Sequence, residues 1–392
     1  MTEFTQGDIT ADDSADSWIV AVDVGGSGSR LVAVQGRGGE RIQLEGRRVE
    51  ILPDGSDAAE VVASLCRSFV AWAVRTGHQG GAIGQDRPRV AAAAVGVTGL
   101  KSLVENPNDI HDALATELRT NRSAVAGDAL TAHLGALRGR PGAVLSVGTG
   151  SVALAWDKTG RWHRADGWGH VFGDLGAGAW IGSAALRAAT AAHDGRPRGG
   201  SPYLLESVTA RLGPVATWPA QVYKTNDRAG RLAALAPAVM AAARAGDRIS
   251  EQILVEAGRH LATTLVTALA PGIPPMASTT GSLVQEDSPL THTLAEQLAE
   301  ERPEVQLVPS AGTPLDGALH LARHLRDNAA RMVAYRPWLT VRIDGRGAAG
   351  GTEDTGAMAL DQDLTGEASA DGMGIPPEFR QLRISRPTPG DF

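Results

Sequence analysis

Four short runs of small residues in this chain have the composition of loops that bind phosphate. Glycine lets a ligand approach the backbone closely, and successive amides of Gly, Ser and Thr can converge on an anion. Taken singly, each run could also be an ordinary tight turn. The runs are Asp23-Val24-Gly25-Gly26-Ser27-Gly28, Gly148-Thr149-Gly150-Ser151, Gly169-His170-Val171-Phe172-Gly173-Asp174 and Thr279-Thr280-Gly281-Ser282. Four of them in one chain favour a phosphate site over four unrelated turns.

Three aspartates stand next to these runs or at the ends of apolar segments. Asp23 ends a predicted buried strand, where an acid needs either a capping role or a cation, and Mg²⁺ shared with phosphates is the cation that fits. Asp128 follows a short apolar run and precedes a predicted helix, at the edge where open α/β sheets place their ligands. Asp128 could equally cap that helix, and Asp174 has the same two interpretations.

Other nucleotide and metal motifs fit poorly. A Walker A loop requires a lysine after a glycine, and none of the three lysines, Lys101, Lys158 and Lys224, follows one. The segment 148–153 matches the dinucleotide pattern G-x-G-x-x-A, but a predicted strand follows it where that motif must open a helix. His320 and His324 lie four residues apart without a third ligand nearby, so we interpret them as part of an ordinary helix face.

Composition narrows the class of protein further. The 392 residues are 43% hydrophobic, enough for two globular domains. With 37 Lys and Arg against 44 Asp and Glu, the net charge of −7 argues against partners such as nucleic acid or anionic membranes. The single cysteine, Cys66, excludes a disulfide framework and a cysteine-ligated zinc or iron–sulfur site within one chain. No apolar run approaches a membrane span and the acidic start lacks signal-peptide features, so we expect a cytoplasmic protein.

The hydrophobic pattern predicts two α/β units that each open with a strand, a glycine turn and a second strand. In the first unit we expect strands at 18–26, 29–34, 41–51, 89–99 and 123–128, and helices at 57–76, 109–119 and 129–138. In the second we expect the strand pair 142–156, a loop at 162–182 leading into helices up to 269, a strand at 276–284, a helix to 301, a strand at 305–310 and a helix at 314–330. The alternation indicates doubly wound sheets.

These elements define the expected domains. Residues 1–17 form a disordered arm, 18–138 an N-terminal lobe and 139–312 a C-terminal lobe. Residues 313–336 form a terminal helix that could pack back on the N-terminal lobe, and 337–392 a mostly disordered acidic tail.

The order and spacing of the glycine runs resemble a known superfamily. DVGGSGSR, GTGS and TTGS are similar to the phosphate-1, phosphate-2 and adenosine segments of the sugar kinase, Hsp70 and actin superfamily. ADGWGHVFGDLGAGAWIG (165–182) resembles the signature of the N-acetylglucosamine kinases in the BadF/BadG/BcrA/BcrD ATPase family. The resemblance spans about residues 18–330 and implies two ribonuclease H-like (actin-like ATPase) domains with a ligand cleft between them.

The resemblance also implies roles for individual residues. Asp128 would be the catalytic base that takes the proton from the sugar hydroxyl, and Asp23 would orient Mg²⁺ through water. The expected ligand contacts are Gly25, Gly26, Ser27, Gly148, Thr149 and Gly150 for the phosphates of ATP, Gly281 and Ser282 for its adenosine, and Trp168, Gly169 and Asp174 for the sugar.

The implied function is an ATP-dependent hexosamine kinase that phosphorylates a primary hydroxyl, O6, of N-acetylglucosamine or glucosamine. Family members usually carry an Asn in a loop after the third strand, whereas segment 45–57 here has none, so glucose or another hexose stays open as the substrate. A nucleotide-gated sugar sensor of the same fold is the alternative. A homodimer is compatible with the sequence.

Overall fold

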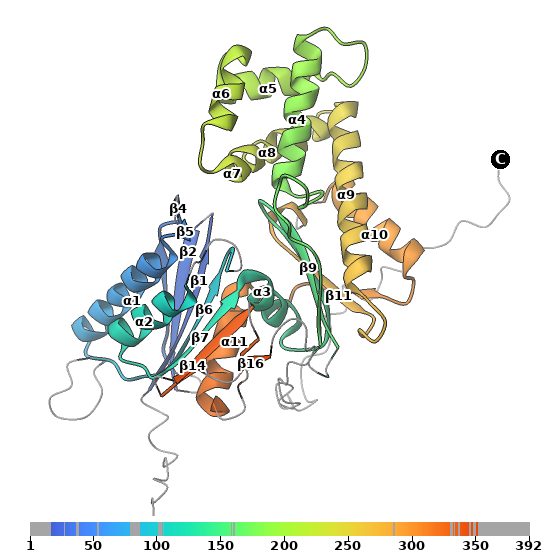
Figure 1. Ribbon diagram of the computed structural model, residues 1–392. Helices are drawn as coiled ribbons and strands as arrows, with labels where there is room; N and C mark the ends of the chain where they lie inside the picture. Colours follow the sequence, from blue (N-terminus) through green and yellow to red (C-terminus); the bar gives the residue numbers. More distant parts are fainter. Residues whose placement is uncertain are drawn as a thin grey trace, which may run out of the picture.

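The computed structural model describes residues 17–351 apart from 27, 37–38, 53–54, 79–86, 101–103, 105, 158, 160, 285–286, 330–331, 333, 336–337, 345 and 348–349. Two β-sheets with helices on their faces form its body, and a group of helices extends from one of them (Figure 1). The expected arm, 1–17, lies outside the described residues except for Ser17, as do residues 352–392 of the expected tail.

The first sheet is built around β1 (Trp18–Gly25), a buried strand of alternating Val and small residues. β2 (Gly28–Gln35) and β3 (Arg41–Gly46) continue it as an antiparallel meander on one side. β6 (Val90–Val97) and β7 (Arg122–Gly127) continue it in parallel on the other. The full strand order is β16-β13-β14-β7-β6-β1-β2-β3, with β15 paired to β14.

The second sheet repeats this plan with a different part of the chain. β8 (Gly142–Val147), β9 (Ser151–Trp156) and β10 (Trp162–Asp166) form an antiparallel meander, and β11 (Met276–Thr280) and β12 (Gln306–Leu307) add in parallel beside β8. The order β10-β9-β8-β11-β12 matches β3-β2-β1-β6-β7 in both sequence and direction. The two units inferred from the sequence therefore share one topology.

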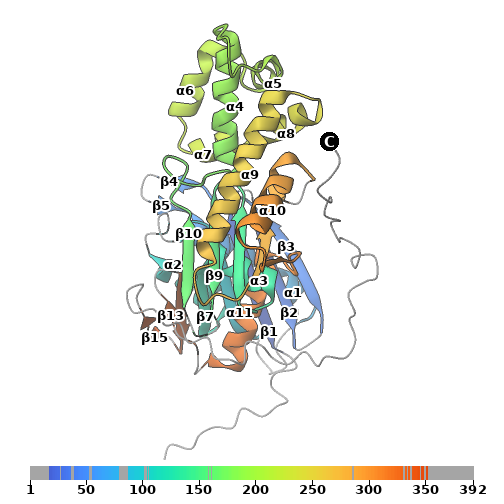
Figure 2. The same ribbon diagram turned by 90° about the vertical axis from the view of Figure 1, so that its right-hand side faces the viewer.

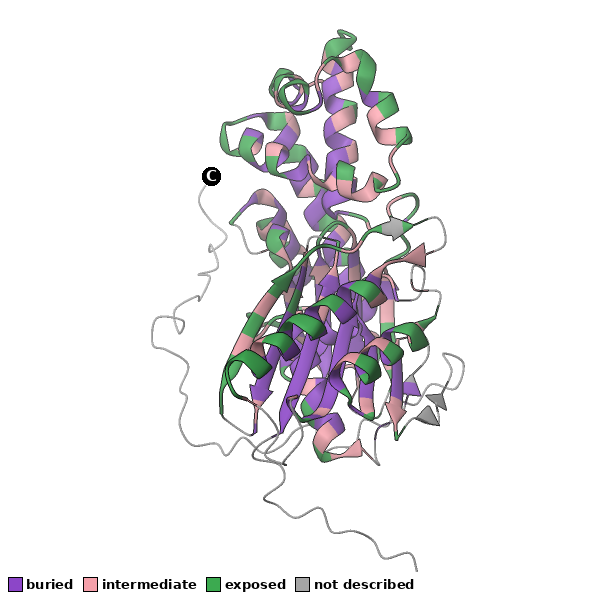
Figure 3. Cartoon of the chain, turned by 90° about the vertical axis from the view of Figure 1, so that its left-hand side faces the viewer, coloured by how far each residue is buried: buried purple, intermediate pink, exposed green. Residues whose placement is uncertain are grey.

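The two faces of the first sheet pack against different helices, and Figure 3 views the sheet from one of these faces. Val20, Val22 and Val24 of β1 pack with α1 (Ala58–Arg75) and α2 (Pro107–Leu118). Ile19 and Ala21 pack with α3 (Asp128–Leu137) and α11 (Pro314–Asp327). Leu154 and Trp156 of the second sheet belong to this last cluster, so α3 and α11 lie between the sheets. Because strand side chains alternate, Asp23 lies on the α3 face.

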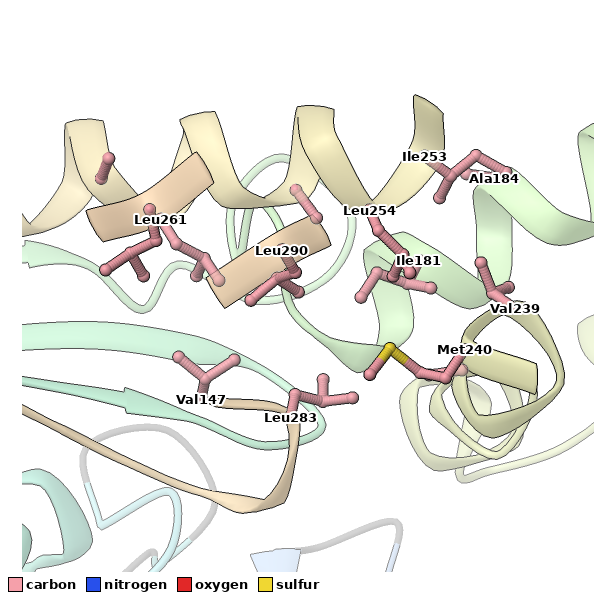
Figure 4. Packing of buried hydrophobic residues seen from close by; sticks show 14 of the residues in the cluster. Val147, Ile181, Ala184, Val239, Met240, Ile253, Leu254, Leu261, Leu283 and Leu290 are labelled. Atoms are coloured by element: carbon pink, nitrogen blue, oxygen red, sulfur yellow. The ribbon is translucent and has the colours of Figure 1, made fainter. Parts of the chain in front are cut away.

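Helices from the middle of the chain cover the outer face of the second sheet (Figure 2). The long helix α9 (Arg248–Ala268) packs on β8, β9 and β10, and α10 (Pro289–Glu301) packs beside it. The remaining helices are α4 (Gly178–His193), α5 (Pro202–Leu212), α6 (Trp218–Tyr223), α7 (Arg228–Ala233) and α8 (Ala236–Arg244). One apolar cluster joins this group to the sheet, including Val147, Ile181 and Leu261 (Figure 4). The start of α4 is therefore fixed against β8.

The chain past α11 returns to the first sheet, contrary to our expectation of a disordered tail from residue 337. β14 (Leu339–Ile343) pairs antiparallel with β7, and Leu339 and Val341 are buried against it. Shorter pairs surround it, formed by β13 (Ala334–Tyr335), β15 (Arg346–Gly347) and β16 (Gly350–Gly351). The hydrophobic alternation in Leu339-Thr340-Val341 is too short to predict a strand within the surrounding polar sequence.

Three other element boundaries differ from the expectation. The third strand stops at Gly46 instead of residue 51, and a small hairpin follows it, β4 (Ile51–Leu52) with β5 (Gly55–Ser56). The expected loop from 162 contains strand β10. The expected strand 305–310 pairs only over β12. None of the helices in the described ranges combines the length and apolar content needed to cross a membrane.

Candidate active site

Asp23 lies near the carboxyl end of β1, beside the two strands that flank it. In the ladder it is opposite Arg30 of β2 and Gly96 of β6. Burial raises the pKa of Asp23 from 3.8 to about 6, the negative charge of Asp128 adds to the rise, and Arg30 opposes it. Because β1, β6 and β7 run parallel and Asp128 directly follows β7, both carboxylates lie at the carboxyl edge of the sheet.

Asp128 is the first residue of α3, directly after β7. The N-cap is Gly127, and the Oδ1 of Asp128 accepts from the amide of the next residue, Ala129, at 2.9 Å. The Thr98 hydroxyl donates to its Oδ2, also at 2.9 Å. Burial raises the pKa of Asp128, whereas these two hydrogen bonds lower it. The capping interpretation therefore does not account for this residue.

The chemistry of these two carboxylates is compatible with a hydrated divalent cation. Both are half-buried acids whose charged forms are disfavoured by burial, and Asp23 is further disfavoured by its neighbour. A cation would relieve both effects. Mg²⁺ is commonly held by one or two carboxylates together with water and substrate phosphates, so the pair suits that ion better than one needing a cage of side chains.

The first glycine turn joins β1 to β2 next to this pair. Gly25 lies against Thr98, whose hydroxyl would be 3.4 Å from a Cβ placed on Gly25. Gly26 is exposed, with open space where a Cβ would point. Ser27 lies outside the described residues. The backbone at 25–26 is therefore open to a ligand beside Asp128.

The second glycine turn joins β8 to β9 and is tied to the start of α4. The Gly148 amide donates to the Gly150 carbonyl at 2.8 Å. The carbonyls of Gly148 and Thr149 accept from the amides of Gly178 and Ala179, each at 3.0 Å. These hydrogen bonds hold the turn in place. Gly148 and Thr149 are nevertheless exposed, so the turn is accessible to a ligand.

The loop between β10 and α4 carries the expected sugar contacts. Asp166 holds it by accepting from the amides of Asp174 (2.7 Å) and Leu175 (2.9 Å). Asp174 is not a helix cap, because α4 begins at Gly178 with Ala177 as its N-cap. Its carboxylate instead accepts weakly from the Gly169 amide (3.4 Å), and burial and Asp166 raise its pKa.

The loop also contacts the second glycine turn. A Cβ on Gly150 would lie 2.5 Å from Oδ2 of Asp174, so only glycine fits there without displacing that carboxylate. Trp168 is 59% exposed, with the Arg164 guanidinium 4.1 Å from its ring centroid. Asp174, Gly169 and Trp168 are thus brought together, next to Gly150.

The adenosine candidates also lie close to the second glycine turn. Gly281 has φ +111°, and a Cβ there would be 1.8 Å from the carbonyl oxygen of Val147. Close packing of this kind requires glycine. Ser282 is exposed at the start of a 3₁₀ turn. The run 279–282 therefore lies directly beside the second glycine turn, which follows Val147.

Several residues of this region were missed by the sequence analysis. Thr98 contacts Asp128, Asp166 organises the loop between β10 and α4, and Arg164 lies between Trp168 and Trp338, 5.3 Å from the centroid of the latter. The apolar run ending at Val97 and the ADGWG segment contain the signals for Thr98 and Asp166. Arg164 and Trp338 are far apart in sequence, and nothing local links them.

The two helical histidines lie elsewhere. His324 is buried on α11, with the side-chain amide of Asn328 3.3 Å from its Nδ1. Burial, with the charges of His324 and Arg323, lowers the pKa of His320 to about 4. Within the described ranges no three His, Cys, Asp or Glu side chains group in a way that could hold a metal.

Two sheets that share five strands in the same order, each with a glycine turn at its first hairpin, define an actin-like ATPase fold, and solved structures agree. A proposed N-acetylglucosamine kinase from Chromobacterium violaceum superimposes with a TM-score of 0.57 at 26% identity, covering 78% of this chain and 99% of that one. One from Porphyromonas gingivalis gives 0.59 at 18% identity, with coverages of 79% and 99%. At that identity the likeness shows the fold alone.

The chain belongs to the BadF/BadG/BcrA/BcrD ATPase family, which it matches over residues 81–322. It is 31% identical over 184 residues to the N-acetylmuramic acid/N-acetylglucosamine kinase of Clostridium acetobutylicum, covering 46% of this chain and 59% of that protein. It is 28% identical over 209 residues to the N-acetyl-D-glucosamine kinase of Dictyostelium discoideum, covering 51% and 65%. The chain thus matches less than two thirds of the length of these relatives.

Proposed function

We propose that this protein is an ATP-dependent sugar kinase that transfers the γ-phosphate of ATP to a primary hydroxyl, O6, of an amino sugar. Family membership supports the use of ATP, and two relatives named as N-acetylglucosamine kinases support the sugar. The observation that carries the proposal is Asp128, a half-buried carboxylate held by Thr98 next to Asp23 and the first glycine turn.

Asp128 would act as the general base. A carboxylate whose pKa is raised by burial accepts a proton more readily than an exposed one, and a positioned base of this kind contributes about 10²–10⁴-fold to rate. The Thr98 hydrogen bond fixes its orientation, so that Asp128 could take the proton from a hydroxyl as that hydroxyl attacks the γ-phosphate.

The glycine turns would hold ATP by amides instead of lysine. Gly25 and Gly26, with Ser27, would line one side of the phosphates, and Gly148, Thr149 and Gly150 the other. Gly281 and Ser282 would contact the adenosine. Phosphoryl transfer is governed mainly by alignment and charge neutralisation, which fixed backbone amides supply.

Asp23 would hold Mg²⁺ through water, with Asp128 close enough to add its charge. When bound, the ion supplies positive charge next to the phosphates. Asp23 itself contributes a carboxylate kept at the end of a buried strand, where its position cannot vary much.

Trp168, Gly169 and Asp174 would bind the sugar. A tryptophan ring offers an apolar face to the sugar ring, and the Asp174 carboxylate can accept hydrogen bonds from hydroxyls. The hairpin β4–β5 follows the third strand, where the segment 45–57 contains no Asn. For this reason glucosamine and glucose remain candidate substrates beside N-acetylglucosamine.

We also propose roles for the domains of the chain. Residues 18–138 and 139–312 would act as two lobes that close on ATP and sugar to exclude water, with 313–336 packed on the first lobe. The protein would work in the cytoplasm on a small-molecule sugar, without nucleic acid or membrane partners. A homodimer is compatible with this scheme.

The test is ADP release with Mg²⁺ and ATP across glucosamine, N-acetylglucosamine, glucose and N-acetylmuramic acid. Asp128→Asn should lower kcat by about 10²-fold or more while ATP binding changes little. Asp194→Asn, an exposed residue at the end of α4, is the matched control and should behave as wild type. An Asp128 variant with wild-type turnover would refute the mechanism.

The sensor alternative predicts a different pattern. If ATP binds but no sugar stimulates ADP release, and sugar instead alters ATP affinity, the protein senses sugar without phosphorylating it. The sugar ligand would then be identified by binding measurements instead of ADP release.

A further inference from the structure

Trp338 lies against the backbone that carries Asp128, although 210 residues separate them in sequence. The Gly127 amide donates to the Trp338 carbonyl at 2.9 Å. A Cβ on Gly127 would meet the Trp338 ring at 3.4 Å, so the indole packs on this glycine. Gly127 is the N-cap of α3, and Asp128 follows it directly. Trp338 therefore covers the strand-to-helix junction from which the proposed base projects.

Specific polar contacts fix the strand that follows Trp338. The buried His111 of α2 bridges the hydroxyls of Ser123 on β7 (2.7 Å) and Thr340 on β14 (2.9 Å). Arg342 reaches back to α2, where it pairs with Asp112 and lies 3.2 Å from Asn108. These contacts set the register of β14 against β7, and with it the position of Trp338.

Trp338 also meets the second sheet. Arg164 of β10 lies with its guanidinium 5.3 Å from the Trp338 centroid and 4.1 Å from that of Trp168. A guanidinium over an aromatic ring at such distances is attracted by the ring's π face. The series Trp168, Arg164, Trp338 and Gly127 thus connects the proposed sugar loop to the junction at Asp128.

We propose that Trp338 is a positioning residue for the transfer reaction: it holds the β7–α3 junction and, through Arg164, sets Asp128 relative to the sugar loop. This inference rests on the proposed kinase function. Trp338 and β14 follow residue 322, where the match to the family ends, so the support comes from this chain's own C-terminal strand. Alignment of reacting groups is sensitive enough that a displacement of about 1 Å can cost 10²-fold in rate.

The experiment compares Trp338→Ala with Trp338→Phe in the full chain. Trp338→Ala should lower kcat by about 10- to 100-fold and leave the Kd of ATP within about twofold. Trp338→Phe keeps an aromatic face for Gly127 and Arg164 and should stay within about threefold of wild type. Trp72→Ala is the matched control, because Trp72 also stacks on a cation-forming side chain, His78, but on α1, away from the junction. Its kcat should be unchanged.

A second readout does not depend on turnover. Hydrogen exchange of the peptide spanning 124–130 should accelerate in Trp338→Ala and not in Trp72→Ala, since the Gly127 amide loses its cover. If wild type phosphorylates none of the four sugars, the kinase proposal fails, whereas unchanged exchange at 124–130 refutes the positioning role of Trp338 itself.

Should Trp338→Ala not fold, Arg164→Met provides the test. It removes the charge between the two indoles and leaves Trp338 in place, so kcat should fall while ATP affinity is retained. If both Arg164→Met and a folded Trp338→Ala keep kcat within about twofold of wild type, the inference is wrong.

Discussion

At the scale of residues, the raised pKa of Asp23, next to Asp128, predicts how activity depends on pH. The folded pKa of Asp23 is about 6, above its ordinary 3.8, and its charged form is the one that would hold Mg²⁺. Activity should therefore be present above pH 6 and fall as pH decreases through it. Because kcat/KM reports the free enzyme, we expect kcat/KM for ATP to fall about tenfold per unit below pH 6.

A bound cation would move this transition. Mg²⁺ favours the carboxylate, so the pH at which kcat itself falls should lie below that for kcat/KM. In Asp23→Asn the dependence near pH 6 should vanish together with most of the activity. A flat kcat/KM profile between pH 5 and 8 in wild type would contradict the assignment.

The site residues that could be predicted from the sequence are those marked by their immediate neighbours in the chain. Asp23 and Asp128 stand at the ends of apolar runs, and strand ends are where open sheets bind ligands. Thr98 and Asp166 were missed since their importance comes from partners 30 and 8 residues away. Trp338 could not be found at all, because only the pairing of β14 with β7 brings it to Gly127.

At the scale of elements, α3, which begins at Asp128, crosses α11 at very short distance. A Cβ on Gly317 would lie 1.8 Å from the Thr131 carbonyl oxygen, and one on Gly135 would lie 2.0 Å from that of Thr313. Two glycines thus let the helix backbones touch.

Gly317→Ala should separate these helices and lower the free energy of unfolding by at least about 1–3 kcal/mol. Arg323→Ala, on the exposed face of α11, should change it by less than about 0.5 kcal/mol. Urea unfolding followed by circular dichroism measures both. Equal urea midpoints for the two variants would mean that the two helices can move apart without loss of stability.

Most elements were predictable because their periodicity is long. β1, α1 and β6 coincide with their predicted segments within a few residues. β10, β12 and β14 were lost or misjudged because each pairs over five residues or fewer and owes its existence to a neighbouring strand. For β10, the repeated plan of the two sheets was a usable signal: the first unit already required a third meander strand.

At the scale of the whole molecule, the buried His133 and the half-buried His320 make stability depend on pH. The pKa of His133 and of His320 is lowered to about 4 by burial, from 6.5. Below pH 6.5 the unfolded chain binds protons that the folded chain does not, so their contribution is fully present above pH 6.5 and is lost as pH falls toward 4.

The raised pKa of Asp23 has the opposite effect on stability between pH 6 and 4. The contribution of His320 is therefore measured by comparing a His320 variant with wild type. His320→Gln should show a weaker loss of stability than wild type from pH 6.5 to 4.5, measured by the urea midpoint at each pH. Parallel curves for the two proteins would show that His320 is not the titrating group.

Cys66 offers a probe of global opening. The only thiol of the chain is buried in α1, and burial raises its pKa, which makes it a poor nucleophile in the folded protein. We expect an aromatic disulfide reagent to label the native protein at least about 100-fold more slowly than the urea-unfolded protein. Fast labelling of the native form would mean that α1 opens without global unfolding.

The position of β14 in the chain has a consequence for biosynthesis. Until residue 343 has been translated, β7 has no partner on its outer side, and the nascent protein presents an open, apolar strand edge next to the proposed base. The active arrangement can therefore assemble only late in translation, and a prematurely terminated product would be prone to aggregation through that edge.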